Sequence, residues 1–370
     1  MALSTKMYQY HFTGSNLFGQ WYGCDKNIIE EFRTFPENLK NELGFNVQCA
    51  KLVHIGWSHN IFQVKDYFYI AGDYKSEEQY LELINLPKEI SDSSNVIIVS
   101  DDYHIIFVNK DTCTIRSLNM ESRDMKTIMI KTETPIEYHK SKRLKKEDHI
   151  LKCVASNGTL MFLTSERFVY SGLLPNLIDT SYCVGTPVDI QCGYEHCMLL
   201  TDVGRVYTWG NGRRLQLGHG DVTTLDVPTE VEALAGIKIT KIAAGGWHSF
   251  ALSEFGDLYA WGWNDTGQLG IQGNSKENLS YELPTLVDIF HDDGREVNNN
   301  IIDVDCGSRH SAILLDDCSV WTSGSNKYGQ LGFPIENNPS AFYFRKSYSL
   351  KYASSVICGQ WSTTTHEITY

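Results

Sequence analysis

Four histidines recur at similar places along the chain and are the first candidates for chemistry. His59, His196, His248 and His310 each follow a glycine by two or three positions. Histidine is a common metal ligand and general base, so four together would predict a metal centre or an acid–base site. However, 52 residues separate the second from the third, and 62 separate the third from the fourth. We therefore expect one equivalent position in each of several repeated units, with every ring buried and bonded to neighbouring backbone.

Serines and cysteines near these histidines do not add a catalytic pattern. Ser249 and Ser311 directly follow a histidine, but a triad is defined by spatial geometry, which adjacency in sequence does not supply. A small residue recurs at one repeat position, which is occupied by Cys192, Cys306, Cys358 and Ala244. Since some repeats have cysteine and another has alanine at this position, we expect a small buried site and not a reactive or zinc-binding thiol. We expect no catalytic residue, no metal and no cofactor.

The stretch AAGGWHSFALSEFGDLYAWGWNDTGQLG, residues 243–270, shows the repeated unit most clearly. Similar stretches occupy residues 190–220 and 304–332, and weaker copies occur at 54–72, 99–118, 155–172 and the end of the chain. Alignment on the histidine position gives seven units, at His59, Tyr103, Thr159, His196, His248, His310 and Ser362. Short strands with turn signals at this period are typical of an all-β repeat architecture.

Glycines and tryptophans mark the structural positions of each unit. Gly193, Gly245 and Gly307 precede the histidines of the three best copies, and Trp209 and Trp261 lie in the following strand. Glycine permits tight turns and close approach of neighbouring chain. Aromatic side chains can fill the space between stacked sheets.

The two ends of the chain complement each other. The last unit, ICGQWSTTTHEITY, stops where a further strand and loop should follow, and residues 8–20, YQYHFTGSNLFGQ, match that missing half. We predict that Tyr10 and the segment around Thr364 lie in one sheet, since closure of a ring removes exposed sheet edges. The predicted fold is a single seven-bladed β-propeller over residues 1–370, made of four-stranded antiparallel blades. Polar insertions are expected near 25–50, 73–93, 119–150 and 271–300.

Composition is consistent with a large folded domain and excludes two classes of partner. Apolar residues make up 42% of the chain and the formal net charge is −13. That charge argues against a surface that coats DNA, which needs clustered lysine and arginine. The chain has no run of about 18 apolar residues, so no membrane span is expected. The ten cysteines contain no CxxC pair, and a reduced intracellular protein is therefore expected. The basic run at 139–149, HKSKRLKKEDH, is either a nuclear-import signal or a solvated loop.

At these motifs the chain resembles the regulator of chromosome condensation family of seven-bladed propellers. The resemblance is carried by Gly-Gly-Trp-His-Ser, Tyr-x-Trp-Gly and Asn-x-x-Gly-Gln-Leu-Gly, and it is most specific over residues 188–332. Ser323, Ser171, Ala71 and Thr13 depart from the pattern, because they stand where the best copies have tryptophan. The chain is most similar to a short member that consists of little besides this domain and pairs with a JmjC-domain oxygenase.

The resemblance implies a non-enzymatic interaction domain in chromatin regulation. Its expected partner is a JmjC-domain oxygenase, its expected location is the nucleus, on chromosomes and also in the cytoplasm, and its expected effects are on histone methylation, heterochromatin silencing and chromosome segregation. Histones would be reached through the complex, without sequence-specific DNA binding or membrane binding. The resemblance also permits the alternative of guanine-nucleotide exchange on a small Ran-like GTPase.

Loop residues that break the small-polar pattern are the candidates for an interface. Tryptophan, tyrosine and arginine dominate binding energy at protein interfaces. The candidates of this kind, with one neighbouring lysine, are Arg213, Arg214, Trp247, Trp263, Arg309, Lys327 and Tyr328. The alternative for Trp247 and Trp263 is that they pack against the next blade.

Overall fold

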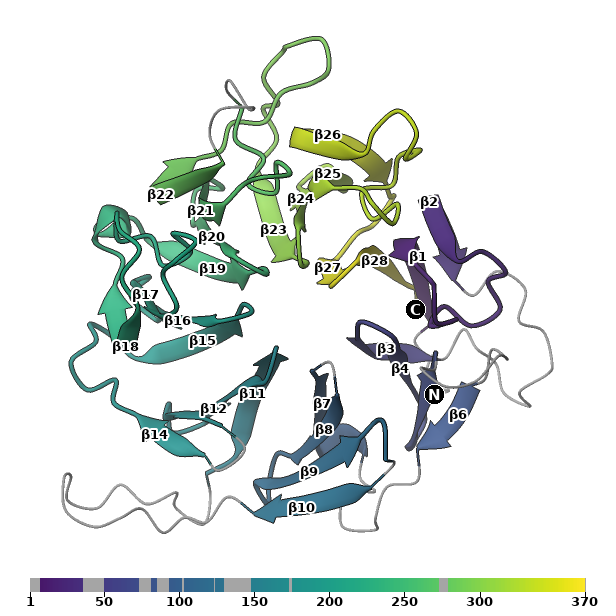
Figure 1. Cartoon of the computed structure of the whole chain (residues 1–370), viewed down its shortest axis with the longest axis vertical. Coiled ribbons are helices and arrows are strands. Elements are labelled where there is room, and N and C mark those ends of the chain that lie inside the picture. Colours follow the sequence, from purple (N-terminus) through teal and green to yellow (C-terminus); the bar gives the residue numbers. More distant parts are fainter. Residues whose placement is uncertain are drawn as a thin grey trace, which may run out of the picture.

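Seven four-stranded antiparallel sheets are arranged as blades around a central axis (Figure 1). The computed structural model describes residues 7–35, 50–72, 81–84, 93–101, 103–122, 124–129, 148–172, 175–272 and 279–369. Two 3₁₀ turns, η3 (Ser93–Asn95) and η4 (Glu232–Leu234), are the helical elements of these ranges. The predicted all-β, seven-bladed propeller is confirmed.

Six blades are built from four consecutive strands that run outward from the axis in chain order. The first of these blades contains β3 (Lys51–Ile55), β4 (Asn60–Val64), β5 (Tyr67–Ala71) and β6 (Leu81–Ile84). The second contains β7 (Val96–Ser100), β8 (His104–Asn109), β9 (Thr114–Asn119) and β10 (Met125–Met129). The third contains β11 (Ile150–Ser156), β12 (Thr159–Thr164), β13 (Val169–Ser171) and β14 (Asn176–Ile178). The next three contain β15 (Pro187–Cys192), β16 (His196–Thr201), β17 (Val206–Gly210), β18 (Leu225–Glu230); β19 (Ile239–Ala244), β20 (His248–Ser253), β21 (Leu258–Trp263), β22 (Ser280–Leu286); and β23 (Ile301–Cys306), β24 (His310–Leu315), β25 (Ser319–Ser325), β26 (Ser340–Ser349).

The seventh blade combines both ends of the chain. Its inner strands are β27 (Val356–Gly359) and β28 (Ser362–Thr369), and its outer strands are β1 (Met7–Ser15) and β2 (Ile28–Phe35). Strands β1 and β28 pair in antiparallel register, with Phe12 opposite Thr364 and Tyr10 opposite His366. The predicted closure of the ring by its two ends is therefore confirmed.

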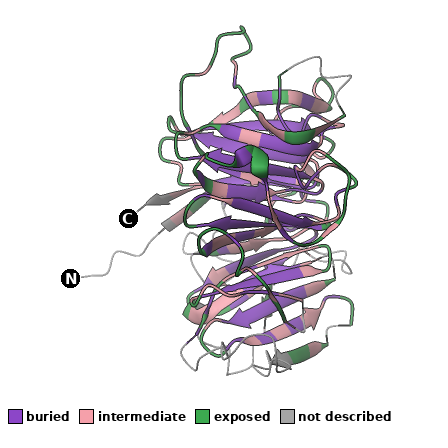
Figure 2. Ribbon diagram, turned by 90° about the vertical axis from the view of Figure 1, so that its left-hand side faces the viewer, coloured by how far each residue is buried: buried purple, intermediate pink, exposed green. Residues whose placement is uncertain are grey.

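Apolar side chains fill the spaces between neighbouring blades. The described residues form seven hydrophobic clusters, and each cluster combines two adjacent blades. Trp261, for example, is fully buried between β15–β18 and β19–β22. Figure 2 shows the same pattern as buried strands under exposed loops. Burial between blades holds the ring together because apolar area removed from water stabilises it by about 25 cal/mol per Å².

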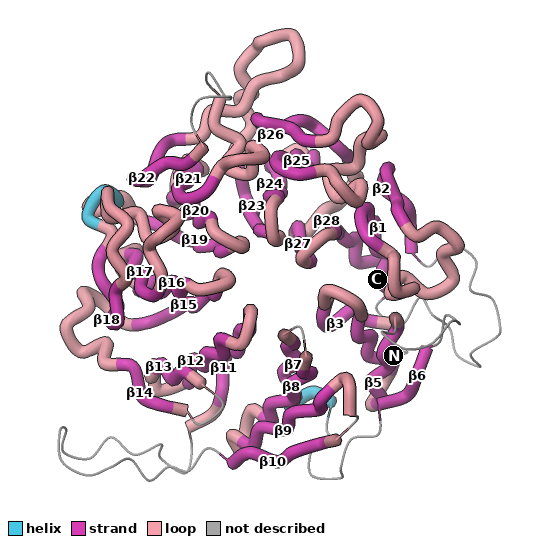
Figure 3. Tube along the Cα trace, in the orientation of Figure 1, coloured by secondary structure: helices cyan, strands magenta, loops and turns pink. Residues whose placement is uncertain are grey.

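The two faces of the ring carry different connections. Because the strands of a blade alternate in direction, the turn after the first strand and the loop after the third lie on one face, which we call the front face. The back face carries the hairpin after the second strand, the connections between blades, and the paired ends Met7 and Thr369. Figure 3 shows that the described connections are loops, apart from the two 3₁₀ turns η3 and η4. Binding surfaces of the fold are therefore loop surfaces.

The four predicted polar insertions each contain the outermost strand of a blade. Strands β2, β6, β10 and β22 lie within the segments 25–50, 73–93, 119–150 and 271–300. An outermost strand has one unpaired edge and limited burial, so it lacks the strong apolar alternation of inner strands. Pro284 in β22 is consistent with such an edge position. Residues 36–49, 73–80, 85–92, 130–147 and 273–278 of these segments, which include most of the basic run, lie outside the described residues.

One unit of the sequence alignment is shifted by one residue. In a regular blade the second strand begins with the repeat histidine. The backbone carbonyl of that histidine accepts a hydrogen bond from the N–H of the glycine three residues earlier, as His248 does from Gly245. In the blade β7–β10 the corresponding bond runs from Asp101 to His104. The equivalent residue is thus His104 and not Tyr103, because a tyrosine beside the true position obscured the register in a unit without glycines.

Candidate interaction surface

The repeat histidines link neighbouring blades. The rings of His196, His248 and His310 are buried at the starts of β16, β20 and β24. Each Nε2 lies close to a hydroxyl of the next blade, at 2.9 Å from Ser249, 2.9 Å from Ser311 and 3.1 Å from Thr363. Each hydroxyl donates in turn to a glutamine backbone carbonyl in the histidine's own blade, that of Gln216, Gln268 and Gln330. Since the hydroxyl proton is used there, the imidazole Nε2–H is the donor.

These contacts correct the expected partner of the histidines and give them a structural role. The partner is a side-chain hydroxyl of the next blade and not neighbouring backbone. Burial lowers the pKa of His196 and His248 to about 3 and that of His310 to about 4. The rings are therefore neutral at pH 7. No group of three or more possible metal ligands occurs among the described residues.

The glycines before the histidines are required by packing. A Cβ on Gly193, Gly245 or Gly307 would lie 2.1 Å from Cε1 of the histidine three residues later. Such a contact cannot be accommodated without moving the ring. Each glycine thus provides the flat surface against which the imidazole lies.

His59 has a different environment from the other three. Its ring is buried, its pKa is lowered to about 3 by burial and by His54, and its Nε2 has no hydrogen-bond partner among the described residues. In the next blade Ile105 follows His104, where a regular blade has a serine or threonine. The blade-to-blade link is therefore absent at this junction.

The two repeat tryptophans are part of the hydrophobic clusters. Trp261 is fully buried, and its indole N–H donates to the carbonyl of Gln216 at 2.9 Å. Trp209 is buried in the cluster between the blades β11–β14 and β15–β18. These residues hold blades together and do not face a partner.

All seven interface candidates lie on the front face. Trp247 and Arg309 belong to turns after first strands, and Trp263 is the last residue of the third strand β21. The other four belong to loops after third strands, namely Arg213, Arg214, Lys327 and Tyr328. The guanidinium of Arg214 lies 4.1 Å from the Trp263 ring centre and 5.6 Å from that of Trp247. The Trp247 ring meets Tyr194 edge to face at 5.2 Å. We call Tyr194, Arg214, Trp247 and Trp263 the arginine–aromatic cluster.

The remaining candidates differ in how available their charges are. Arg309 forms an ion pair with Asp265. Burial alone would raise the pKa of the Asp265 carboxyl, but the Arg309 guanidinium holds it below its usual range. Arg213 is exposed. Lys327 is also exposed, with its ammonium 5.2 Å from the ring centre of Tyr328. Free cationic groups on this face are thus concentrated in the loops after third strands.

A second aromatic group on the front face was not predicted. Phe18 meets Trp57 at 5.5 Å between ring centres, Trp57 meets Trp361 at 6.3 Å, and Trp361 meets Tyr328 at 5.3 Å. We call these four residues the closing cluster, because they join the seventh blade to its two neighbours. The sequence contained a signal for it, since Trp361 precedes Ser362 as Trp247 precedes His248.

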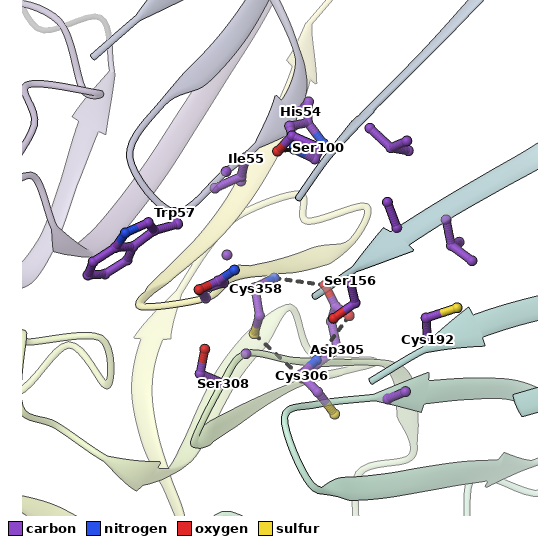
Figure 4. A pocket seen from close by; sticks show the side chains of 18 of the residues that line it. His54, Ile55, Trp57, Ser100, Ser156, Cys192, Asp305, Cys306, Ser308 and Cys358 are labelled. Carbon is purple, nitrogen blue, oxygen red and sulfur yellow. Dashed lines mark hydrogen bonds between the residues drawn. The ribbon is translucent and has the colours of Figure 1, made fainter. Parts of the chain in front are cut away.

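A channel of about 340 Å³ follows the axis between the two clusters and is lined by the innermost strands of all seven blades. Trp57 and Tyr194 belong to the clusters and also line the channel. Figure 4 shows the lining, in which the carboxylate of Asp305 accepts the N–H groups of Cys306 at 2.9 Å and Cys358 at 2.8 Å. The front face therefore carries a crescent of aromatic and cationic side chains around the axial channel.

The channel does not contain a catalytic triad among its described residues. His54 Nε2 lies 2.6 Å from Ser100 Oγ, and no hydrogen bond in the described part of the chain joins His54 to a carboxylate. Burial raises the pKa of the Cys306 and Cys358 thiols well above the usual value, so they are protonated at neutral pH. A protonated thiol is a poor nucleophile.

Repeat models of one family match the most regular part of the chain, within residues 188–330. The regulator of chromosome condensation (RCC1) repeat matches residues 203–252 and 256–314. A second model of the same repeat matches 188–216, 239–268 and 301–330. These matches coincide with the blades that contain the histidine–hydroxyl links. No described helix of the chain has the length and apolar character that a membrane crossing requires.

RCC1 domain-containing protein 1 of mouse is 33% identical over 203 residues, which cover 47% of this chain and 54% of the relative. The human protein of that name is 31% identical over 212 residues, covering 48% and 56%. The match thus spans about half the length of these relatives.

Solved structures share the fold of the whole ring. Human WBSCR16 superposes with a TM-score of 0.71 at 17% identity, over 97% of this chain and 98% of that one. Prp20p of Saccharomyces cerevisiae superposes with a TM-score of 0.72 at 16% identity, over 99% and 92%. Together with the repeat matches, these comparisons show that the chain is a seven-bladed propeller with regulator of chromosome condensation repeats, homologous to RCC1 domain-containing protein 1.

Proposed function

We propose that the chain is a non-enzymatic docking propeller that acts in chromatin regulation by binding a JmjC-domain oxygenase through its front face. It would work in the nucleus, on chromosomes, and influence histone methylation, heterochromatin silencing and chromosome segregation through that enzyme. The observation that carries the proposal is the crescent formed by the arginine–aromatic cluster and the closing cluster on one face.

The crescent has the side-chain types and the order that an interface requires. Trp247 and Trp263 are half-buried, and Arg214 is stacked between them. Side chains that are already held in place lose little conformational entropy on binding. Tryptophan, tyrosine and arginine in such settings supply most of the binding energy of protein interfaces.

The choice of partner is supported by similarity. The relatives that match the chain include RCC1 domain-containing protein 1 of mouse and human, at 33% and 31% identity. The motifs at 188–332 resemble the short family member that pairs with a JmjC-domain oxygenase. In such a complex the oxygenase would contribute iron and 2-oxoglutarate, and the propeller would contribute the docking surface.

Binding of the purified chain to a recombinant JmjC-domain oxygenase tests this proposal. The double variant R214A/W263A removes the stacked pair. We expect it to raise the dissociation constant at least about tenfold. The matched control is F255A, because Phe255 is 77% exposed on a back-face hairpin. Equal affinity of R214A/W263A and the unaltered chain would exclude this surface, and no binding by the unaltered chain would exclude this partner.

Guanine-nucleotide exchange on a small Ran-like GTPase is the second candidate. Its support is the fold shared over 99% of the chain with Prp20p, a protein described with its binding to Gsp1p and histones. At 16% identity this similarity concerns the fold alone. Release of a fluorescent guanine nucleotide from a Ran-like GTPase should stay at its intrinsic rate when the chain is added at micromolar concentration. A clear acceleration would favour exchange instead.

A further inference from the structure

The axial channel opens on the front face in the centre of the crescent. One residue from the turn region of each blade lines it there: Trp57, Asp101, Ser156, Tyr194, Gly246, Ser308 and Gln360. Its volume of about 340 Å³ falls in the range of pockets that hold small molecules or single side chains. A protein that docks on the crescent therefore faces a preformed pocket.

The channel is electrostatically one-sided. Asp101 and Asp305 contribute carboxylates to the lining, and none of the described lining residues is a lysine or an arginine. Lys241 forms an ion pair with Asp303 and its charge also partly offsets the rise that burial causes in the pKa of Asp305, while Lys152 pairs with Asp189. Asp101 also contacts the His104 ring, with 3.4 Å between Oδ1 and Nδ1. The described lining thus contributes two carboxylates without a lysine or arginine of its own.

The carboxylates retain capacity for a further donor. Asp305 accepts one N–H from Cys306 and one from Cys358, whereas a carboxylate has about four acceptor directions. Asp305 and Ser156 both line the channel and are labelled in Figure 4. Ser308, Trp57 and Tyr194 are also among the lining residues. Aromatic faces and carboxylates are the groups that bind organic cations in proteins.

We propose that the axial channel is a pocket for one cationic side chain, a lysine or an arginine, that a partner protein projects from its docking surface. The idea of a docked partner rests on the proposed function, whereas the preference of the pocket for an organic cation is a property of this chain alone. The pocket would give the front face a central anchor in addition to the crescent around it.

The test uses small cations as probes on the full chain. n-Butylammonium and n-butylguanidinium imitate the two side chains, and n-butanol and butyrate are the neutral and anionic controls. We expect saturable NMR shifts of the Trp57 indole and of the Gly245 and Gly307 amides with both cations. Equal shifts with n-butanol, or no saturable shift, would overturn the proposal.

Two variants locate the probe in the channel. S156R fills the pocket with an arginine of the chain itself and should abolish the saturable shift. D101N removes a charge but can keep its structural bonds, because Oδ1 alone accepts the N–H groups of Tyr103 and His104; it should weaken cation binding about fivefold. Unfolding midpoints establish that both variants are folded. Unaltered cation binding by S156R would contradict the proposal, whereas failure of the oxygenase to bind in the earlier experiment would leave the probe result unchanged.

Discussion

At the scale of single residues, the most informative feature is the bond from a buried histidine to a hydroxyl of the next blade. The sequence predicted that the recurring histidines are buried, one per blade. It could not reveal the partner, because Ser249 is 53 residues from His196 and only the ring brings them together. His248 binds a hydroxyl of the following blade, whereas Ser249 binds the histidine of the preceding blade. These two adjacent residues therefore belong to different junctions between blades and do not form a catalytic pair.

Removal of one hydroxyl should measure this link. S311A leaves the buried Nε2–H of His248 without its hydroxyl partner, and the carbonyl of Gln268 keeps only the hydroxyl of Ser323, at 3.5 Å. We expect the free energy of unfolding to fall by about 1–3 kcal/mol, measured by urea denaturation. S181A at an exposed serine is the control and should change it by less than about 0.5 kcal/mol. A loss no larger than that of S181A would show that the link contributes nothing.

The buried histidines also predict loss of stability in acid. Their pKa values of about 3–4 lie below the value of about 6.5 for an unfolded histidine. Between those values the unfolded chain binds more protons than the native chain, so the free energy of unfolding falls as the pH is lowered from about 6.5. Asp305, whose pKa is raised to about 6 by burial, acts in the opposite direction and offsets about one histidine.

Urea denaturation at pH 7 and pH 5 tests the direction of this effect. The midpoint should be lower at pH 5, and H248Q should lose less stability between the two pH values than the unaltered chain. The expected difference is about 1.4 kcal/mol per pH unit for each histidine removed, within the range between the two pKa values. A midpoint that is constant or rises at pH 5 would show that the rings are accessible to protons in the native state.

At the scale of the elements, inner strands were predictable from the sequence and outer strands were not. Strands such as β20 carry fully buried side chains and a regular apolar pattern. Strand β22 is mostly half-buried or exposed, so its sequence reads as a polar insertion. The closing cluster was missed for another reason: Phe18, Trp57 and Trp361 come from three distant segments that meet only when the ring closes.

The seventh blade supports a prediction about chain connectivity. Met7 and Thr369 are opposite one another in the paired strands β1 and β28. A short hairpin linker between these positions, with new ends placed at the exposed hairpin beside Val203, should therefore give a folded propeller. We expect one cooperative thermal transition within a few degrees of the original midpoint. In contrast, deletion of residues 7–15 should abolish the cooperative transition, and a cooperative transition of that deletion variant would contradict closure by β1.

At the scale of the whole molecule, the ring has two unequal halves. The junctions from β15–β18 through the seventh blade have histidine–hydroxyl links. The junction from β3–β6 to β7–β10 lacks the link, and Ile105 stands in place of the hydroxyl residue. The repeat models match only within 188–330 for the same reason, since the motif residues are those that form the links.

The aromatic crescent follows the linked blades and extends onto one further blade, β3–β6. The arginine–aromatic cluster lies on the blades β15–β18 and β19–β22, and the closing cluster joins β23–β26, the seventh blade and β3–β6. A surface supported by linked blades is held in a fixed geometry, which favours binding without rearrangement. The proposed docking surface on the front face therefore lies mainly on linked blades.

Hydrogen exchange of the chain with and without a JmjC-domain oxygenase tests the central claim most directly. The account predicts protection of the front-face turns and loops that contain Trp247, Trp263, Tyr328 and Trp361, with unchanged exchange in the back-face hairpin at Phe255. Protection confined to the back-face hairpins would contradict it.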